Sequence, residues 1–186
     1  MKTVKKSLVS LLCAGLLLTI FPPLAFADAL NYNYVKGGLA VYPDFSGQDF
    51  IGAEFKGSYL ITPEIFAFGG LLYLTDDVDL TAIHVGGAYR LTMDESTDIY
   101  GGLTIEHQDI DGVFDDTALG IRGGVRHRLS PDLEIGGQLR IITGDLDYFG
   151  IRGTTRYFLD ENRSIVGELD IYDGELGLLV GLSLNI

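Results

Sequence analysis

Residues 119–129 read LGIRGGVRHRL, and large apolar side chains alternate there with arginines. Leu119, Ile121 and Val125 fall on one set of alternate positions, whereas Arg122 and Arg126 fall on the other. Successive side chains of a β-strand point to opposite faces. This stretch therefore predicts a strand with one apolar face and one charged face.

The same alternation recurs through the chain after residue 27, and no helical periodicity occurs there. Turn residues separate the alternating runs, and four similar turns begin at Ile61, Leu91, Leu129 and Leu159. We therefore predict an all-β fold, an antiparallel up-and-down transmembrane β-barrel of ten strands, with eight strands as the alternative. The expected strands cover residues 33–42, 50–61, 65–75, 80–91, 98–107, 117–129, 133–143, 148–159, 164–172 and 175–186.

The first 27 residues have the composition of a secretory signal peptide. Lysines at positions 2, 5 and 6 precede an apolar run at 8–21, and residues 25–27 read AFA, which suits signal peptidase. We expect residues 1–27 to be removed and residues 28–186 to form the barrel domain. The only cysteine lies in the predicted signal, so no disulfide is expected in the exported domain. A net charge of −13 argues against a nucleic-acid partner.

The orientation of the two strand faces separates a membrane barrel from a soluble lipocalin-like barrel, which would turn its apolar face inward. Glycines crowd the charged face, as expected where large side chains share a narrow interior. A basic residue at the lipid midplane would cost about 2–4 kcal/mol, and the apolar face carries none. We predict a lumen charge network made of Lys36, Glu54, Lys56, His84, Arg90, Glu106, Arg122, Arg126, Arg128, Glu134, Arg140, Arg152, Arg156 and Glu168.

Aromatic residues recur on the apolar face beside the four similar turns. Rings at one level are typical of the girdle that a membrane barrel places at the bilayer interface. The predicted girdle consists of Tyr59, Tyr89, His127 and Tyr157.

With these features the chain resembles the small outer-membrane β-barrel proteins of Gram-negative bacteria. The resemblance covers residues 28–186 and depends on the signal peptide, the paired strands with short turns and an alternating last strand. That strand ends in Leu184-Asn185-Ile186 and lacks the terminal aromatic residue that the group usually has. The resemblance implies location in the outer membrane, contact with its lipid and lipopolysaccharide, and insertion by the barrel-assembly machinery.

The charged lumen has two interpretations from sequence. A structural ion network would fill the interior, because buried charges need partners. A water-filled path with excess positive charge would instead favour anions. Ten strands enclose little more space than eight, whose side chains already fill the interior, so a wide pore is not expected. We predict a structural or narrow-channel barrel that is not an enzyme and has no catalytic residues.

The turns at the other end of the barrel are rich in aspartate. Such residues suit solvated tight turns, but their hard oxygens also suit Ca²⁺ or Mg²⁺ held between the rim and lipid phosphates. A surface that binds divalent cations and lipopolysaccharide is therefore an alternative function. The metal candidates are Asp76, Asp77, Asp79, Asp109, Asp111, Asp115 and Asp116.

An enzyme active at this rim is the remaining alternative, as a protease or a lipid-modifying hydrolase. Outer-membrane proteases of ten strands use aspartates and a histidine at the outer rim. His107, with Asp109 and Asp111, lies at a comparable place in this sequence. No serine stands near a histidine, so a Ser/His arrangement is not indicated.

Overall fold

The computed structural model describes residues 30–186 apart from residues 46, 111, 113, 145–146 and 173; the side chains of Asp44 and Phe114 are also outside the description. The predicted signal peptide at 1–27 and the rim candidate Asp111 lie outside the described residues. Within the described part, no helix is long and apolar enough to span a bilayer.

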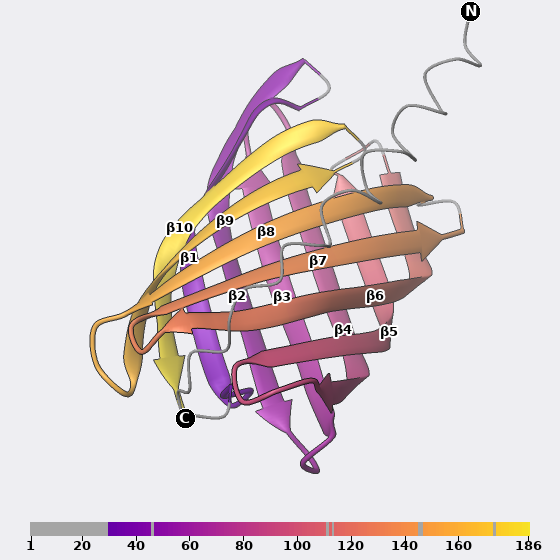
Figure 1. Ribbon diagram of the computed structural model, residues 1–186. Coiled ribbons are helices and arrows are strands. Elements are labelled where there is room, and N and C mark those ends of the chain that lie inside the picture. Colours follow the sequence, from indigo (N-terminus) through magenta and orange to yellow (C-terminus); the bar gives the residue numbers. More distant parts are fainter. Residues whose placement is uncertain (1–29, 46, 111, 113, 145–146, 173) are drawn as a thin grey trace, which may run out of the picture.

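The ten strands form one closed antiparallel sheet in which each strand pairs with its neighbours in sequence. They are β1 (Tyr34–Phe45), β2 (Gln48–Leu60), β3 (Ile65–Thr75), β4 (Asp79–Thr92), β5 (Thr97–Ile110), β6 (Phe114–Ser130), β7 (Leu133–Thr143), β8 (Tyr148–Phe158), β9 (Arg163–Tyr172) and β10 (Glu175–Asn185). The barrel closes between β1 and β10, where Tyr34 lies opposite Asn185. In Figure 1, β7 to β9 cross in front of β2 to β4, as the tilted strands of a barrel do.

The predicted fold class and the ten strands are confirmed, and the eight-strand alternative is wrong. The largest boundary difference concerns β5 and β6. Their pairing continues through Asp109 opposite Asp115 to Ile110 opposite Phe114, where a loop was expected at 108–116. Asp109, Asp115 and Asp116 therefore lie on strand ends.

Three of the four similar turns, which flank the barrel end where β1 begins and β10 ends, have one common geometry. In each, the backbone N–H of the first turn residue donates to the carbonyl oxygen four residues later. The N–H of Ile61 donates to Ile65 at 2.8 Å, and that of Leu159 donates to Arg163 at 2.8 Å. The matching bond of the second turn begins at Met93, so the expected alignment at Leu91 was wrong by two residues. The reason is that Asp94 supplies the side-chain acceptor there. Its Oδ1 accepts the Ser96 backbone N–H at 2.8 Å, which holds the pKa of the Asp94 carboxyl below its usual range.

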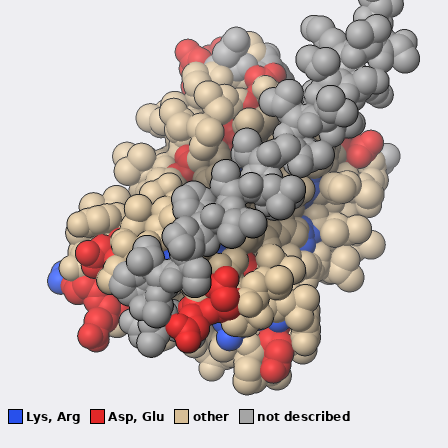
Figure 2. Space-filling model, in the orientation of Figure 1, with Lys and Arg blue, Asp and Glu red and all other residues tan. Residues whose placement is uncertain are grey.

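Side chains at even positions of β1 to β9 and at odd positions of β10 face the lumen, and those at the alternate positions face outward. Phe45, beyond the bulge in β1, also packs inside. Leu103 and Val180 are each 67% exposed on the outside, whereas Arg122 and Glu168 are each 4% exposed on the inside. Most of the flank in Figure 2 is accordingly uncharged, and acidic side chains gather toward the two ends. An apolar exterior around a charged interior is the distribution of a transmembrane β-barrel. The soluble lipocalin-like alternative, which requires the opposite arrangement, is wrong.

Glycines on the lumen face permit close approach between neighbouring strands. A Cβ atom added to Gly52 of β2 would lie 1.9 Å from the backbone oxygen of Tyr73 in β3. Backbone cannot move aside as the end of a flexible side chain can. Outward-facing Gly101, by contrast, has no atom within 4 Å of such a Cβ.

We expect Gly52→Ala to lower the free energy of unfolding by about 1–3 kcal/mol, because overpacking forces a backbone shift. Urea unfolding in lipid vesicles would measure the change. Gly101→Ala is the matched control and should change stability by no more than about 0.5 kcal/mol. Equal effects of the two substitutions would contradict the close approach of β2 and β3.

A charged lumen as the candidate functional site

Arg152 of β8 is the centre of an ion network that crosses the lumen. Its Nη2 donates to Asp170 Oδ2 at 2.6 Å, and its Nη1 lies 3.3 Å from Glu54 Oε1 and 3.4 Å from Glu168 Oε2. Glu54 comes from β2 on the opposite wall, whereas Glu168 and Asp170 come from neighbouring β9. One guanidinium group therefore ties the two walls of the barrel together.

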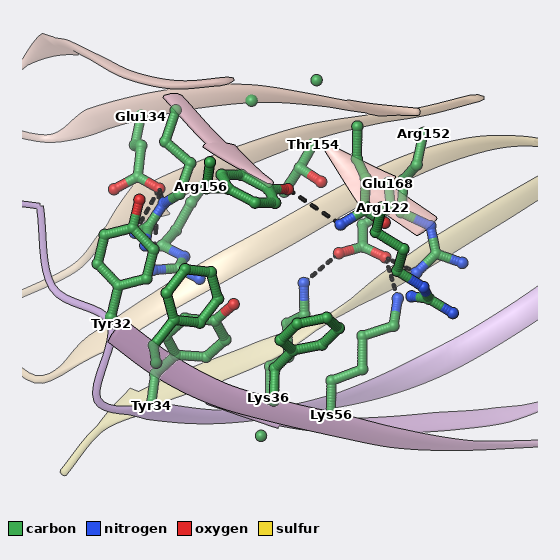
Figure 3. A pocket seen from close by; sticks show the side chains of 18 of the residues that line it. Tyr32, Tyr34, Lys36, Lys56, Arg122, Glu134, Arg152, Thr154, Arg156 and Glu168 are labelled. Atoms are coloured by element: carbon green, nitrogen blue, oxygen red, sulfur yellow. Dashed lines mark hydrogen bonds and ion pairs between the residues drawn. The ribbon is translucent and has the colours of Figure 1, made fainter. Parts of the chain in front are cut away.

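Two lysines extend this network along β1 and β2. Lys56 Nζ lies 2.7 Å from Glu54 Oε2 and 2.7 Å from Glu168 Oε2. Lys36 Nζ also pairs with Glu168. Figure 3 shows both ammonium groups converging on this carboxylate from the same wall. Together with Arg152, the two lysines give Glu168 three cationic partners.

Two further arginines have their own carboxylates. Arg122 donates to Glu106 Oε1 through Nε at 2.9 Å and Nη2 at 2.7 Å. Arg140 Nη2 donates to Asp170 Oδ1 at 2.5 Å. These charge-assisted bonds lie among buried side chains, where removing one partner is costly.

A second cluster lies nearer the barrel end where the chain enters β1. Glu134 Oε1 is 2.8 Å from Arg126 Nη2 and 4.0 Å from Arg156 Nη1, and Glu134 Oε2 is 3.7 Å from Arg128 Nη2. Three arginines therefore surround one carboxylate. Beside this cluster, Arg90 Nη1 pairs with Asp98 at 3.0 Å.

The segment at 30–33, just before β1, lies against these arginines. The carbonyl of Asn31 accepts a bond from Arg126 at 2.9 Å. The Tyr32 ring lies 4.3 Å from the Arg126 guanidinium and 4.9 Å from that of Arg90. Leu30 and Tyr32 are buried with Phe66 and Ala88. This segment therefore fills part of the lumen near the chain termini.

Aromatic rings fill the lumen at the opposite, aspartate-rich end. Phe45 packs against Tyr42, Phe50 and Tyr172, with ring centroids 5.5–6.0 Å apart, and Tyr172 packs on Tyr148 at 4.1 Å. We call these five residues the aromatic cap. Between the cap and the segment at 30–33 lie cavities of about 100 Å³ and about 50 Å³. Since water occupies about 30 Å³ per molecule in the liquid, each cavity has room for only a few molecules.

The structure places each residue of the predicted charge network at an even, lumen-facing position. His84 lines both cavities, with its ring 6.3 Å from Phe68. The predicted network lacks Asp98 and the tyrosines of the strands that face the lumen, and it lacks Asp170, although Asp170 falls on the charged face of its alternating run. Their even positions in alternating strands were the signal that could have found them. The omitted tyrosines are Tyr34, Tyr42, Tyr100, Tyr148 and Tyr172.

The predicted girdle residues all lie on the outer face beside the turns at the terminal end. Tyr59, Tyr89 and Tyr157 are 61%, 50% and 52% exposed. His127 Nδ1 shares a hydrogen bond of 2.9 Å with Thr97 Oγ1. Three exposed rings therefore lie at one end of the barrel, and their contact with lipid headgroups stays a prediction.

The rim candidates that the structure describes do not gather into one metal centre. Among the described residues, no three His, Cys, Asp or Glu side chains are grouped as ligands of one ion would be. Asp76 and Asp77 are exposed between β3 and β4, and Asp79 begins β4 and accepts a bond from Tyr73 at 2.9 Å. Asp115 lies 3.8 Å from His107, whereas Asp109 and Asp116 lie on paired strand ends.

His107 points outward from β5, away from the lumen. Its Nδ1 shares a hydrogen bond of 3.0 Å with Thr117 Oγ1, and its side chain is 40% exposed. In the candidate catalytic set of His107, Asp109 and Asp111, the histidine therefore faces away from the lumen. Asp111 lies outside the described residues.

No protein-family description and no curated protein matches the chain. Solved structures with a similar fold include the KdgM porin, with 9% identity, coverage of 82% of this chain and 99% of that one, and a TM-score of 0.49. The COG4313 outer membrane channel from Pseudomonas putida F1 has 11% identity, coverage of 89% and 100%, and a TM-score of 0.47. Neisserial surface protein A has 13% identity, coverage of 86% and 100%, and a TM-score of 0.41. Similarities this low do not bear on what this chain binds or conducts.

Proposed function

We propose that the chain is a small outer-membrane β-barrel protein with a closed lumen, structural in role and without catalytic activity. The apolar exterior supports residence in a membrane, and the predicted signal peptide supports export to the outer one. In our proposal the termini and the four similar turns face the periplasm, and the aspartate-rich rim faces outward. The barrel-assembly machinery would insert the chain.

The observation that carries the proposal is the obstruction of the lumen at three levels. The segment at 30–33 occupies one end, the ion network around Arg152 crosses the middle, and the aromatic cap occupies the other end. The cavities of about 100 Å³ and about 50 Å³ are separated by side chains that line both, namely His84, Arg122 and Arg152. This obstruction supports a lumen without a continuous water-filled path.

Lipid and lipopolysaccharide are the partners that this proposal implies. Asp76, Asp77 and Asp115 of the rim are exposed, and in our proposal they lie near the level of the lipopolysaccharide phosphates. Because carboxylate and phosphate oxygens both bind hard cations, Ca²⁺ or Mg²⁺ bridging the two is part of the proposal. Lipid phosphates would have to complete the ligand set, since the described rim side chains do not form one alone.

A narrow anion channel is the second candidate, and one observation favours it. The described lumen contains more cationic than anionic side chains, which would attract anions if a side-chain movement opened a path. This candidate requires movement of the cap as well as of the network.

Planar-bilayer recording distinguishes the two candidates. We expect protein purified from the outer-membrane fraction in detergent to insert without discrete conductance steps. Reproducible conductance steps with anion selectivity would contradict the closed barrel and support the channel. Peptide and lipid hydrolysis should also be absent, and hydrolysis that disappears in His107→Ala would contradict the non-catalytic assignment.

A further inference from the structure

The described lumen has an excess of positive charge. Its cations are Lys36, Lys56, Arg90, Arg122, Arg126, Arg128, Arg140, Arg152 and Arg156, and the carboxylates paired with them are Glu54, Asp98, Glu106, Glu134, Glu168 and Asp170. Nine cations minus six carboxylates leaves +3 in this part of the chain. Uncompensated charge away from bulk water is strongly unfavourable, so such a lumen needs a counterion.

Part of this excess lies around Glu134. Arg126 and Arg156 both face this one carboxylate, which leaves a local charge of +1 for the three groups. No other acidic side chain is paired with Arg126 or Arg156 among the described residues.

Two of these arginines have N–H groups without a hydrogen-bond acceptor in the described structure. They are Nε and Nη1 of Arg156 and Nη1 of Arg126, all inaccessible to solvent. Arg156 is 3% exposed and Arg126 is 8% exposed. Arg156 Nη1 lies 4.0 Å from Glu134, which is too far for a hydrogen bond. Buried donors of this kind normally have an acceptor.

Arg126 and Arg156 both line the larger of the two lumen cavities, of about 100 Å³, together with Tyr34, Lys36 and Thr154. The centre of the Tyr34 ring lies 4.4 Å from the Arg156 guanidinium and 5.8 Å from that of Arg126, so the ring packs against both groups. Figure 3 shows Arg156 and Glu134 at one end of the cavity and Lys36, Lys56 and Glu168 toward the other. The lining of the space between them includes six lysine and arginine side chains and three tyrosines.

We propose that this cavity is a binding site for a small oxyanion, a carboxylate or a phosphate. Arg156 and Arg126 would donate to its oxygens through their unpartnered N–H groups, and the anion would reduce the excess positive charge. The planar guanidinium group matches the two-oxygen edge of a carboxylate or phosphate, which a spherical halide lacks. The cavity volume limits the ligand to a few non-hydrogen atoms.

The test is thermal unfolding of the mature barrel in a phosphate-free, non-ionic detergent. Acetate and inorganic phosphate are titrated separately, against sodium chloride at equal ionic strength. We expect at least one oxyanion to raise Tm by several degrees in a saturable way, because a ligand that binds only the folded state stabilises it. This experiment measures binding and not conductance. A negative result for oxyanion binding is therefore distinguishable from a negative result for the closed-barrel proposal.

Arg156→Gln should weaken the apparent affinity for the oxyanion at least tenfold. Arg156→Lys should weaken it by an intermediate factor, since the positive charge remains but the planar guanidinium group with its several N–H donors is lost. Arg163→Gln is the matched control, because Arg163 is exposed outside the lumen and pairs only locally with Asp160. If Arg156→Gln does not fold, Arg156→Lys carries the comparison. An equal shift in chloride, or unchanged oxyanion affinity in the folded Arg156 variants, would overturn the proposal.

Discussion

Glu134→Ala is expected to lower the free energy of unfolding by about 3–5 kcal/mol, as removal of one partner from a buried ion pair does. Glu134 is 5% exposed and is the carboxylate paired with Arg126 and Arg156. Without it, the local charge of the cluster becomes more positive. Urea unfolding in lipid vesicles would measure the loss.

Glu95→Ala provides the control, because Glu95 is exposed in the turn between β4 and β5. That substitution should change stability by no more than about 0.5 kcal/mol. A loss of about 1 kcal/mol or less for Glu134→Ala would mean that water reaches the cluster and screens it, as in a conducting lumen. Bilayer recording of the same variant would then be expected to show altered ion selectivity.

The alternation of side chains made the faces of the barrel predictable from sequence. An up-and-down barrel has only local turns, and even positions stay on the lumen face from β1 to β9. In β10 the lumen face shifts to odd positions, such as Leu179 and Ser183, but the alternation itself continues. Arg122 and Arg140, on neighbouring strands, could therefore both be assigned to the interior before any geometry was known. The glycines of that face, such as Gly52, were predictable for the same reason.

Partner choice was not predictable in the same way, because it depends on strand register and on depth across the lumen. Arg122 and Arg140 lie directly opposite each other in the register of β6 and β7, yet they pair with different carboxylates. Glu54 and Arg152 are 98 residues apart and meet only because the barrel closes.

The segment at 30–33 and the outward position of His107 also lay beyond sequence reasoning. Residues 30–33 precede the first strand, and no periodicity indicates that Tyr32 turns into the lumen between two arginines. His107 had been considered with the rim aspartates as a chain neighbour, whereas its odd position in β5 directs it outward to Thr117. Parity along the strand was the stronger guide, and nearness in sequence was misleading.

Asp170→Ala is expected to lower the free energy of unfolding by about 3–5 kcal/mol, because it removes one partner from buried ion pairs. Asp170 is the carboxylate paired with Arg140, at 2.5 Å, and it also accepts bonds from Arg152 and the Tyr42 hydroxyl of the aromatic cap. Arg152 retains Glu54 and Glu168 in the variant, whereas Arg140 loses its ion pair among the described residues.

A double-mutant cycle separates the lost pair from general damage to the lumen. Replacing a whole buried pair by apolar groups of similar volume is often nearly neutral, whereas removing one partner leaves an isolated charge. Asp170→Ala combined with Arg140→Met should therefore be less destabilising than the sum of the two single substitutions, by about 0.5–3 kcal/mol. Urea unfolding in vesicles gives all four values of the cycle. Strictly additive losses would mean that Arg140 and Asp170 are not energetically coupled, and the stability of the lumen would then have to come from its other ion pairs and from packing.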